Sequence, residues 1–432
     1  MDAKLDIPPL RRGLVLGLAA ICLALALAGC STEKAGKRKV VRMWTFPMLP
    51  ELRDREMYEL LVRDFEKEQP GIKVQIETLP WAGRIQKMIT AAAGNRTPDA
   101  VYLNLDLVAR LVSEKLLRPI DDNMTSEDRA DYDPAVMDGI TLNGHQWVFP
   151  ILRTVTTSLY NKDLFAAAGL DPERPPATWQ ELDVAAHRLT QDHNGDGHPD
   201  QWGVGYVFGG DTLNLTFWPL LWQAGGEVLS PDGRRVAFDS SAGMDALKFI
   251  VGLFKDGCIP GSYLADVPGQ EFPSGKLGYF MGVGPLEIQQ LRRDAPKLRF
   301  GVAPILKYKQ RASYGSIGGF GIFAASRHPE ETVLWLRFLT RTDNMKRFCR
   351  TTGFLPPRRS VGALYSDDPL LSALEKEAQF CRPDVKSVYA RQIMQALAPE
   401  IQQAALGKKT EEQAIRDGAA AANEFLIADQ KK

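Results

Sequence analysis

The sequence predicts an α/β protein made of two lobes. The chain has 432 residues, which exceeds the roughly 250 to 300 residues at which a single hydrophobic core stops growing. Strand-like and helix-like segments alternate along both halves, and this alternation favours open, mostly parallel sheets flanked by helices. Residues 149–165 join the two halves. We therefore expect the binding site of this protein in the crevice between two lobes.

The first half predicts strands over 40–45, 72–77 and 100–103, because apolar residues alternate or run without interruption there. Helical spacing of apolar residues predicts helices over 57–65, 81–92 and 107–112, the first of which ends before Pro70-Gly71. Ligands of open α/β sheets bind beyond the carboxyl ends of the strands. Four candidate binding residues follow two of these strands: Trp44, Phe46, Asn104 and Asp106.

The joining run predicts a strand over 155–160 and a short helix over 162–168, closed by Gly169. A new helix begins at a capping box over 178–181. Beyond it we expect strands over 202–208, 277–281, 300–303 and 322–324, helices over 213–224 and 244–254, and a helical tail after Pro329. Residues 227–238 have the pattern of a hairpin.

A glycine-rich run over 315–321 precedes the expected strand 322–324. It lacks the Gly-Lys-Ser/Thr that a phosphate loop requires, and no helix follows it. We expect these glycines to let the backbone approach a ligand or another segment closely.

The first 29 residues have the features of a lipoprotein signal peptide. Arg11 and Arg12 precede an apolar run over 13–28, which is short for a bilayer span. Leu27-Ala28-Gly29-Cys30 resembles a bacterial lipobox, so we expect lipid on Cys30 and a polar tether over 30–39. An uncleaved anchor helix is the alternative, and it too would tether the protein to a membrane. The expected location is the cell membrane, facing the periplasm or the cell exterior.

Composition and spacing exclude several classes of function. Lys and Arg number 53, and so do Asp and Glu, so neither a nucleic acid nor an anionic surface is expected as a partner. The five histidines have no zinc or nucleophile spacing, and no Gly-x-Ser-x-Gly elbow occurs. The residues therefore show no obvious catalytic set, and no required cofactor is expected.

Three cysteines follow the tether: Cys258, Cys349 and Cys381. An odd number at wide spacing gives no disulfide framework, so buried free thiols are expected. One bridge between Cys349 and Cys381 is the alternative.

Residues 192–200 resemble the first part of a calcium loop. Asp192, Asn194 and Asp196 supply oxygens at alternate positions, glycine stands at the sixth position, and Asp200 stands at the ninth. The glutamate usual at position twelve is replaced by Gly203. Two interpretations stay open: a structural calcium site on these four residues, or a solvated turn whose side chains cap local amides.

Several motifs in a fixed order resemble a known family: residues 65–74, 97–101, 159–165 with Ala168-Gly169-Leu170, 176–179, Gly318-Gly319 and Gly353-Phe354-Leu355-Pro356. Together, behind a lipobox, they resemble the extracellular solute-binding proteins of bacterial ABC importers. The likeness is to the carbohydrate-binding family that includes maltose-binding protein, and it covers nearly the whole mature chain.

The resemblance implies the type II periplasmic-binding-protein fold, in which hinge strands join two lobes. Lobe one would comprise 40–149 and 301–338, and lobe two 150–300 and 339–432. The family's ligand contacts would fall at Trp44, Phe46, Asn104, Asp106, Arg153, Phe208, Trp218, Trp222, Met281, Gly282, Gly318, Gly319 and Arg358. Arg153, at the start of the joining run, would both flex with closure and touch the ligand.

The implied function is that of a lipid-anchored, monomeric component that delivers a sugar or oligosaccharide to the permease subunits of an ABC importer. Aromatic faces would cover the apolar side of a sugar ring, while Asp, Asn and Arg would bind its hydroxyls. Three alternatives follow in order: the same fold binding a glycerophosphodiester or a polyamine, a surface glycosidase, and a purely structural lipoprotein. Arg153 and Arg358 facing the crevice would favour an anionic ligand.

Overall fold

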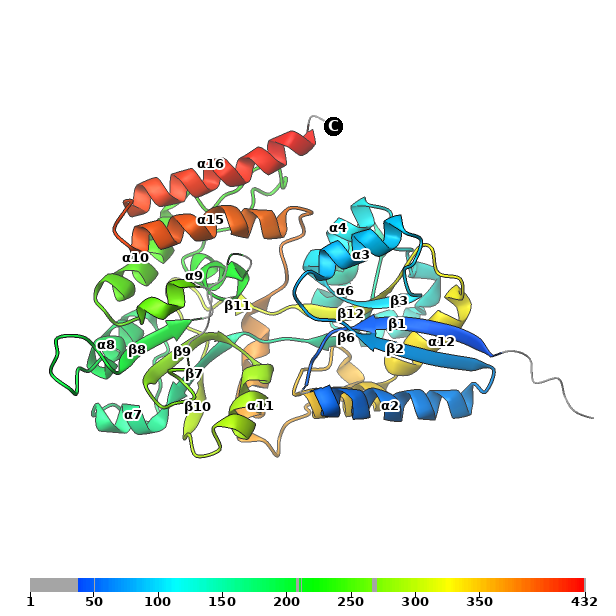
Figure 1. Ribbon diagram of the computed structural model, residues 1–432, viewed down its shortest axis with the longest axis horizontal. Coiled ribbons are helices and arrows are strands. Elements are labelled where there is room, and N and C mark those ends of the chain that lie inside the picture. The colour runs from blue at the N-terminus through cyan, green and yellow to red at the C-terminus, as the bar shows by residue number, and fades with distance from the viewer. Residues whose placement is uncertain (1–37, 50, 207–209, 211, 266–269, 431–432) are drawn as a thin grey trace, which may run out of the picture.

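A computed structural model describes residues 38–49, 51–206, 210, 212–265 and 270–430. They form two α/β bodies, lobe one and lobe two, which lie side by side, each around its own sheet (Figure 1). The expected signal peptide, Cys30 and nearly all of the tether lie outside the described residues. Among the helices that the structure describes, none is both long and apolar enough to cross a membrane.

Lobe one is built on a five-stranded sheet. In spatial order its strands are β2 (Ile72–Thr78), β1 (Lys39–Thr45), β3 (Ala100–Asn104), β12 (Ile317–Ile322) and β6 (Phe149–Arg153). The alternation at Ile72 and Val74 is that of an edge strand with one buried face. β3 and β12 are buried along nearly their whole length, as central strands covered on both faces must be.

Seven helices of the described chain belong to lobe one, because they pack on this sheet or on one another. They are α2 (Glu51–Glu68), α3 (Arg84–Ala93), α4 (Leu105–Ser113), α5 (Ser126–Asp131), α6 (Pro134–Ile140), α12 (Pro329–Leu339) and α13 (Thr342–Thr352). A small hairpin of β4 (Thr141–Leu142) and β5 (His145–Gln146) turns at Asn143-Gly144. Both turn residues have positive φ, as this turn requires.

Lobe two is built on a four-stranded sheet in the order β10 (Phe300–Ala303), β7 (Thr157–Asn161), β9 (Leu277–Val283) and β8 (Trp202–Tyr206). Its helices are α7 (Lys162–Ala167), α8 (Trp179–Leu189), α9 (Phe217–Gln223), α10 (Ser241–Lys255), α11 (Pro285–Asp294), α14 (Pro369–Glu377), α15 (Ala390–Ala405) and α16 (Glu411–Gln430). α15 and α16 form a pair that packs on α10.

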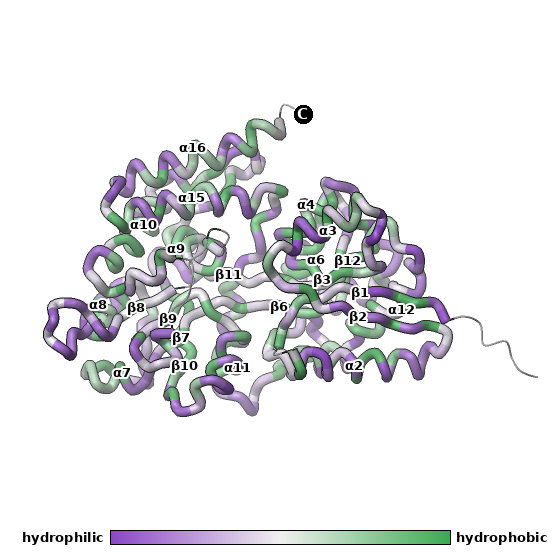
Figure 2. The backbone as a smooth tube through the Cα atoms, in the orientation of Figure 1, coloured by the Kyte–Doolittle hydropathy of each residue, from purple (hydrophilic) through white to green (hydrophobic). Residues whose placement is uncertain are grey.

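Hydrophobic and hydrophilic residues alternate along α2 of lobe one and α16 of lobe two, as expected for helices with one buried face (Figure 2).

The chain crosses between the lobes at 154–156, 304–316 and 362–368. Residues 149–165 cross as predicted, since β6 lies in the first sheet and β7 in the second. Three expected boundaries are wrong. β6 belongs entirely to lobe one, so the first crossing begins after Arg153 and not at residue 150. Residues 301–303 pair with β7 in lobe two, while α13 packs on α2 and β6 and so places 342–352 in lobe one.

The two-lobed type II architecture is confirmed, but both sheets are mixed. β1 is parallel to β2 and β3, and β8 is parallel to β9. β12 is antiparallel to β3 and β6, and β7 is antiparallel to β9 and β10. These antiparallel strands are the ones next to the crossings, because a strand that enters a lobe from the other lobe runs against its neighbours.

The glycine-rich run forms β12 itself, so the expected strand over 322–324 is wrong by five residues. A Cβ on Gly318 would lie 1.9 Å from Tyr102 Oη, and one on Gly319 would lie 2.6 Å from the carbonyl oxygen of Phe149. Glycine is therefore required here for close packing against another segment, which was one of the two expected reasons. The expected hairpin over 227–238 is reduced to a single bridge between Leu229 and Val236.

Cys258, Cys349 and Cys381 are all free thiols. Cys349 lies in lobe one with its Sγ 3.7 Å from the carbonyl oxygen of Ile151, while the Cys381 Sγ lies 3.9 Å from that of Glu377. The alternative of a Cys349–Cys381 bridge is therefore wrong, because the two thiols lie against different segments.

The packing at Gly318 gives a stability prediction. We expect Gly318→Ala to lower the free energy of unfolding by about 2 kcal/mol, because the new methyl group must displace the buried Tyr102 ring. Gly252→Ala in α10 is the matched control, since nothing lies within 4 Å of its Cβ. That change should raise the stability by about 0.5 to 1 kcal/mol. Urea denaturation of both variants checks the prediction, and equal stabilities would contradict it.

Candidate functional site

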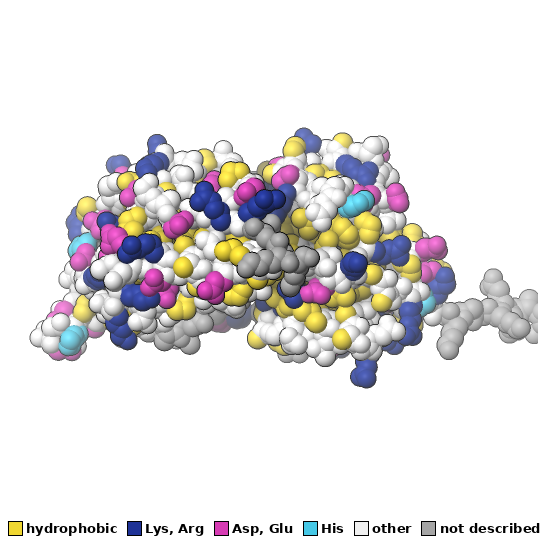
Figure 3. All heavy atoms as spheres, turned by 90° about the horizontal axis from the view of Figure 1, so that it is seen from above, with side chains coloured by type: hydrophobic (Ala, Val, Ile, Leu, Met, Phe, Trp, Pro, Cys, Tyr) yellow, Lys and Arg dark blue, Asp and Glu magenta, His cyan; other side chains and the backbone are white. Residues whose placement is uncertain are grey.

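A small cavity of about 10 Å³ lies where the two lobes meet. Seen from above, acidic and basic side chains gather at this junction (Figure 3). That volume is far below the roughly 300 to 1,000 Å³ usual for ligand pockets, so the lobes would have to separate to admit a ligand here. Asp106 comes from lobe one, Trp218 and Trp222 come from α9 of lobe two, and the other lining residues are Asn214, Tyr314, Asp384, Val385, Ala390 and Met394. The structure thus brings three predicted site residues together from opposite lobes.

Asp106 reaches the cavity because β3 ends at Asn104 and α4 begins at the next residue. Asn104 is the N-cap of α4, and Asp106 lies in its first turn, where the helix dipole favours a negative charge. The predicted placement of both side chains at the carboxyl end of β3 is confirmed. The side chain of Asn104 lies close by, with Nδ2 3.5 Å from Ser316 Oγ.

An ion pair connects the lobes at the cavity. Arg391 Nε of α15 donates to Asp106 Oδ2 at 2.6 Å, and the two side chains are only 18% and 7% exposed. The sequence analysis missed Arg391, which lies 285 residues from Asp106 in no motif. Only the folded chain places these two charges together.

Asp384 is a second buried carboxylate in the same cavity. It accepts hydrogen bonds from Tyr314 Oη and from Ser316 Oγ, the latter at 2.7 Å. Burial, followed by repulsion from Asp106, raises the pKa of Asp384 to about 7. The sequence analysis missed Asp384 as well, because a lone Arg-Pro-Asp carries no signal of burial.

Two acceptor atoms at this site have no hydrogen-bond partner among the described residues: Asn104 Oδ1 and Asp106 Oδ1, both buried. Buried polar atoms in folded proteins are nearly always hydrogen-bonded. A donor group of a ligand in the cavity could satisfy Asp106 Oδ1, whereas Asn104 does not line the cavity.

The aromatic part of the cavity comes from α9, on which Trp218 and Trp222 lie one turn apart and are buried. The Trp218 ring packs at 5.8 Å from that of Phe238, and the Arg382 guanidinium lies 4.9 Å from the Trp222 ring. These contacts hold both indoles in place and leave them as a rigid apolar wall of the cavity.

Met281 and Gly282 end β9 beside the start of α9, but neither lines the cavity. Gly282 has a φ of 78°, and a Cβ there would lie 3.0 Å from Thr216 Cγ2. Gly282 therefore permits the close approach of β9 to α9, which holds the two tryptophans. Phe208 lies outside the described residues.

Four other predicted contacts are occupied within lobe one. Trp44 Nε1 donates to Glu77 Oε2 at 2.8 Å, and Phe46 is buried and stacks on Trp81 at 4.8 Å. Gly318 and Gly319 face the Tyr102 ring and the Phe149 backbone. None of the four lines the interlobe cavity, so ordinary core packing is their role in this structure.

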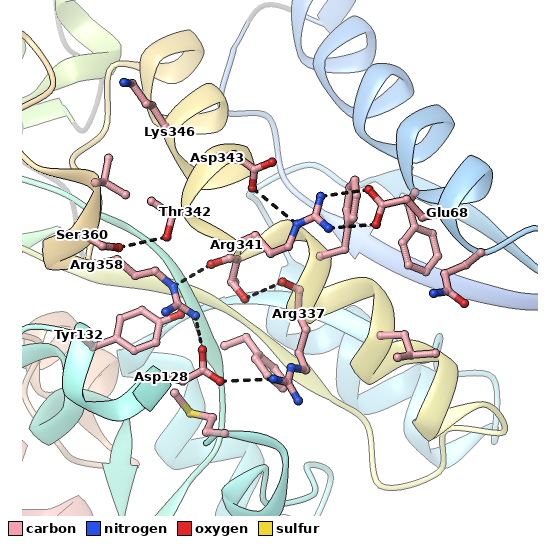
Figure 4. A pocket seen from close by; sticks show the side chains of 18 residues that line it. Glu68, Asp128, Tyr132, Arg337, Arg341, Thr342, Asp343, Lys346, Arg358 and Ser360 are labelled. Carbon is pink, nitrogen blue, oxygen red and sulfur yellow. Dashed lines mark hydrogen bonds and ion pairs between the residues drawn. The ribbon is translucent and has the colours of Figure 1, made fainter. Parts of the chain in front are cut away.

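The two predicted arginines also point into lobe one. Arg153 Nη1 lies 3.3 Å from Asp133 Oδ2. Arg358 bonds Asp128 at 2.8 Å and Asp131 at 3.1 Å, and its guanidinium stacks over Tyr132 at 4.5 Å (Figure 4). Acidic residues of α5 and of the N-cap of α6 therefore pair with both predicted arginines in this structure.

The loop over 192–200 caps its own backbone. Asp192 accepts amide hydrogen bonds from Gly195 and Gly197, both at 2.8 Å, and these bonds lower its pKa. Asp196 accepts from the His198 amide and Asp200 from the His193 amide. In the described part of the chain, no group of three or more His, Cys, Asp or Glu side chains is placed to hold a metal ion. The geometry favours the turn interpretation over the calcium site.

A calcium titration separates these two interpretations. Because each carboxylate already caps local amides, we expect millimolar calcium to change the melting temperature of the wild-type protein and of Asp196→Ala by the same amount. A rise confined to the wild-type protein would establish the calcium site instead.

Arg358 gives a second prediction. Arg358→Ala leaves Asp128 and Asp131 without their cation and frees the Thr340 carbonyl, which accepts from Arg358 Nε at 2.8 Å. We expect a loss of about 2 kcal/mol in unfolding free energy, with ligand affinity unchanged. Chemical denaturation and a ligand titration measure the two effects, and weaker binding at unchanged stability would restore Arg358 to the site.

Comparison with known proteins agrees with this geometry. Residues 51–346 match the family model described as bacterial extracellular solute-binding protein. A protein of Brucella abortus (strain 2308), whose name describes it as a binding protein, is 26% identical over 427 residues. The match covers 96% of this chain and 98% of that protein. The maltotriose-binding protein of Pyrococcus abyssi is 23% identical over 313 residues, covering 70% of this chain and 63% of its own length.

Solved structures share the fold. An ABC transporter solute-binding protein of Thermotoga lettingae, bound to α-D-tagatose, superposes with a TM-score of 0.76 at 24% identity, covering 90% of this chain and all of the other. A substrate-binding protein of Listeria monocytogenes in complex with cycloalternan has a TM-score of 0.79 at 21% identity, covering 90% of this chain and 99% of the other. The family model covers more than half of the chain, and the chain therefore belongs to the bacterial extracellular solute-binding proteins.

Proposed function

We propose that this protein captures a sugar or a small oligosaccharide in the interlobe cavity and delivers it to the permease subunits of an ABC importer. The observation that carries the proposal is the cavity itself. It joins two tryptophan rings of lobe two to an unpartnered acceptor oxygen of lobe one, Asp106 Oδ1. A sugar ring has both matching surfaces, an apolar face for the indoles and hydroxyl donors for the oxygens.

Family membership supports the transport role, since the chain is an exported substrate-binding protein of an ABC transporter. Relatives and structural neighbours supply the ligand class. Their names and titles specify α-D-tagatose, cycloalternan and maltotriose. These are binding proteins and not enzymes, so the chain is proposed to bind its ligand without cleaving it.

The charges at the cavity disfavour an anion. Arg153 and Arg358 are committed to acidic partners in lobe one, and Arg391 is paired with Asp106. A phosphate group would therefore meet two carboxylates and no unpaired guanidinium among these three arginines. A relative from Pectobacterium atrosepticum, 23% identical, is named for binding sn-glycerol 3-phosphate, but the cavity of this chain favours a neutral ligand.

Capture would proceed by closure of the lobes. Asp106 and Asn104 belong to one lobe and the two tryptophans to the other, so a ligand that contacts both sets stabilises the closed arrangement. The three chain crossings are the segments that can flex. We further propose that Cys30 carries lipid and tethers the mature, monomeric protein beside its permease.

A thermal-shift screen followed by calorimetry tests this proposal. We expect one of D-tagatose, maltose or maltotriose to stabilise the protein, whereas sn-glycerol 3-phosphate and spermidine should not. Trp222→Ala should weaken sugar binding at least about tenfold, because it removes half of the apolar wall. Trp44→Phe is the control and should bind normally, because Trp44 packs inside lobe one. No sugar response would contradict the proposal, and release of smaller sugars would show a glycosidase instead.

A further inference from the structure

The interlobe cavity contains two carboxylates from different lobes. Asp106 belongs to α4 of lobe one, and Asp384 follows the short strand β13 (Cys381–Arg382) on the way to α15 of lobe two. Both are at most 8% exposed. The charged and titratable groups that face Asp384 are Asp106, Arg391, Tyr314 and Tyr102. Arg391 is the cation of this set, and its Nε bonds Asp106.

Asp384 is also bonded to a hinge. Tyr314 belongs to β11 (Ser313–Tyr314), which pairs with β13, and Ser316 lies two residues further along the same crossing segment. The hydroxyls of both residues donate to the Asp384 carboxylate. Ser316 in turn bonds the other crossing segment, because its amide donates to Thr154 Oγ1 at 2.8 Å and its carbonyl accepts from the Thr154 amide at 2.8 Å.

Ser316 also extends the network into lobe one. Asn104 Nδ2 lies 3.5 Å from Ser316 Oγ, and Asn104 precedes Asp106 by two residues. Asp384 therefore lies between the hinge that moves and the acceptor atoms that a ligand would contact. Among the described residues no hydrogen bond links Asp384 directly to Asp106, and Asp106 Oδ1 has no partner at all.

Bringing the lobes together has an electrostatic cost when both carboxylates are charged. With the lobes in contact, Asp384 is buried and shares the cavity with Asp106 of the opposite lobe, and both effects disfavour the ionised form of Asp384. Separation of the lobes would move Asp106 away from Asp384 and admit water. The pKa of the Asp384 carboxyl would then return toward its ordinary value. A proton on Asp384 removes the repulsion between the two groups.

We propose that Asp384 is a proton-linked positioning residue, such that uptake of one proton at its carboxyl group favours closure of the two lobes over the cavity. The second half of the inference rests on the proposed function: because a ligand binds between the lobes, the same proton tightens ligand binding.

The direction of the pH dependence follows from linkage. Burial and Asp106 raise the pKa of Asp384 to about 7 in this structure. Separation of the lobes would remove both causes, so the pKa should be lower in an open arrangement. Closure is therefore coupled to proton uptake. It becomes more favourable as the pH falls through about 7 and loses this contribution above that value.

Closure can be measured without any ligand. We expect small-angle X-ray scattering of the ligand-free protein to give a smaller radius of gyration at pH 6 than at pH 8. Tryptophan fluorescence should change over the same pH range, because Trp218 and Trp222 line the cavity. Asp384→Asn, which keeps the shape of the side chain and cannot ionise, should abolish both changes.

Asp54→Asn is the matched control. Asp54 is a buried carboxyl of α2 whose pKa burial raises to about 6, and it accepts from the Met48 amide far from the cavity. This variant should keep the pH response of the wild-type protein. If Asp384→Asn does not fold, Asp106→Asn tests the same point, because removal of the repelling charge should move the transition to lower pH.

The ligand experiment separates this inference from the proposed function. Calorimetric titration with maltotriose, and with D-tagatose, should show binding about threefold or more tighter at pH 6 than at pH 8, a difference that Asp384→Asn removes. If neither sugar binds but the ligand-free protein closes with acid, the sugar proposal fails and the proton-linked closure stands. A pH response that is absent in the wild-type protein, or unchanged in Asp384→Asn, overturns the inference about Asp384.

Discussion

The pairing of two crossing segments is the constraint on which the rest of the structure depends. Thr154 and Ser316 exchange backbone and side-chain hydrogen bonds, the Thr156 amide donates to the Tyr314 carbonyl at 2.9 Å, and Ser313 Oγ donates to the Thr156 carbonyl at 2.6 Å. This short ladder continues directly into β6 and β12 in one lobe and into β7 in the other. Any relative motion of the lobes must bend it, so the groups bonded to it sense whether the cavity is open or closed.

The distribution of charge decides what the cavity can hold. α5 and the start of α6 supply Asp128, Asp131 and Asp133, which draw Arg358 and Arg153 into lobe one. Those ion pairs fix the segment after α13 against the end of β6, where the Arg153 amide donates to the Leu355 carbonyl at 2.7 Å. The arginines therefore stabilise the lobe beside the hinge, and the cavity is left with Asp106, Asp384 and the single bridging Arg391. Two carboxylates at the cavity are consistent with the proposed neutral ligand, because they would repel an anion.

The sequence was sufficient for the parts of the fold that local pattern controls. Strands β1, β2, β3, β8, β9 and β10 and the capping box at Thr178 follow from periodicity and from side-chain chemistry near in sequence. The placement of Asp106, Trp218 and Trp222 at one cavity also agreed with expectation. Arg391 and Asp384 could not be found in this way, because burial and a partner 285 residues distant leave no local signal. The prediction for Arg358 missed its acidic partners for a similar reason. Those partners belong to a segment distant in sequence, and no motif connects that segment to Arg358.

The unpartnered oxygen of the cavity shows how a ligand could favour closure. Leaving a buried acceptor unsatisfied costs about 1 to 3 kcal/mol, and the cavity between the lobes has one, Asp106 Oδ1. Separation of the lobes would expose this atom to water and remove that cost. A donor group of a ligand would remove the same cost with the lobes together. This contribution is below the roughly 5.5 kcal/mol needed to reverse a two-state population from 1:99 to 99:1. Contacts with the two tryptophans of the other lobe would therefore have to supply the rest.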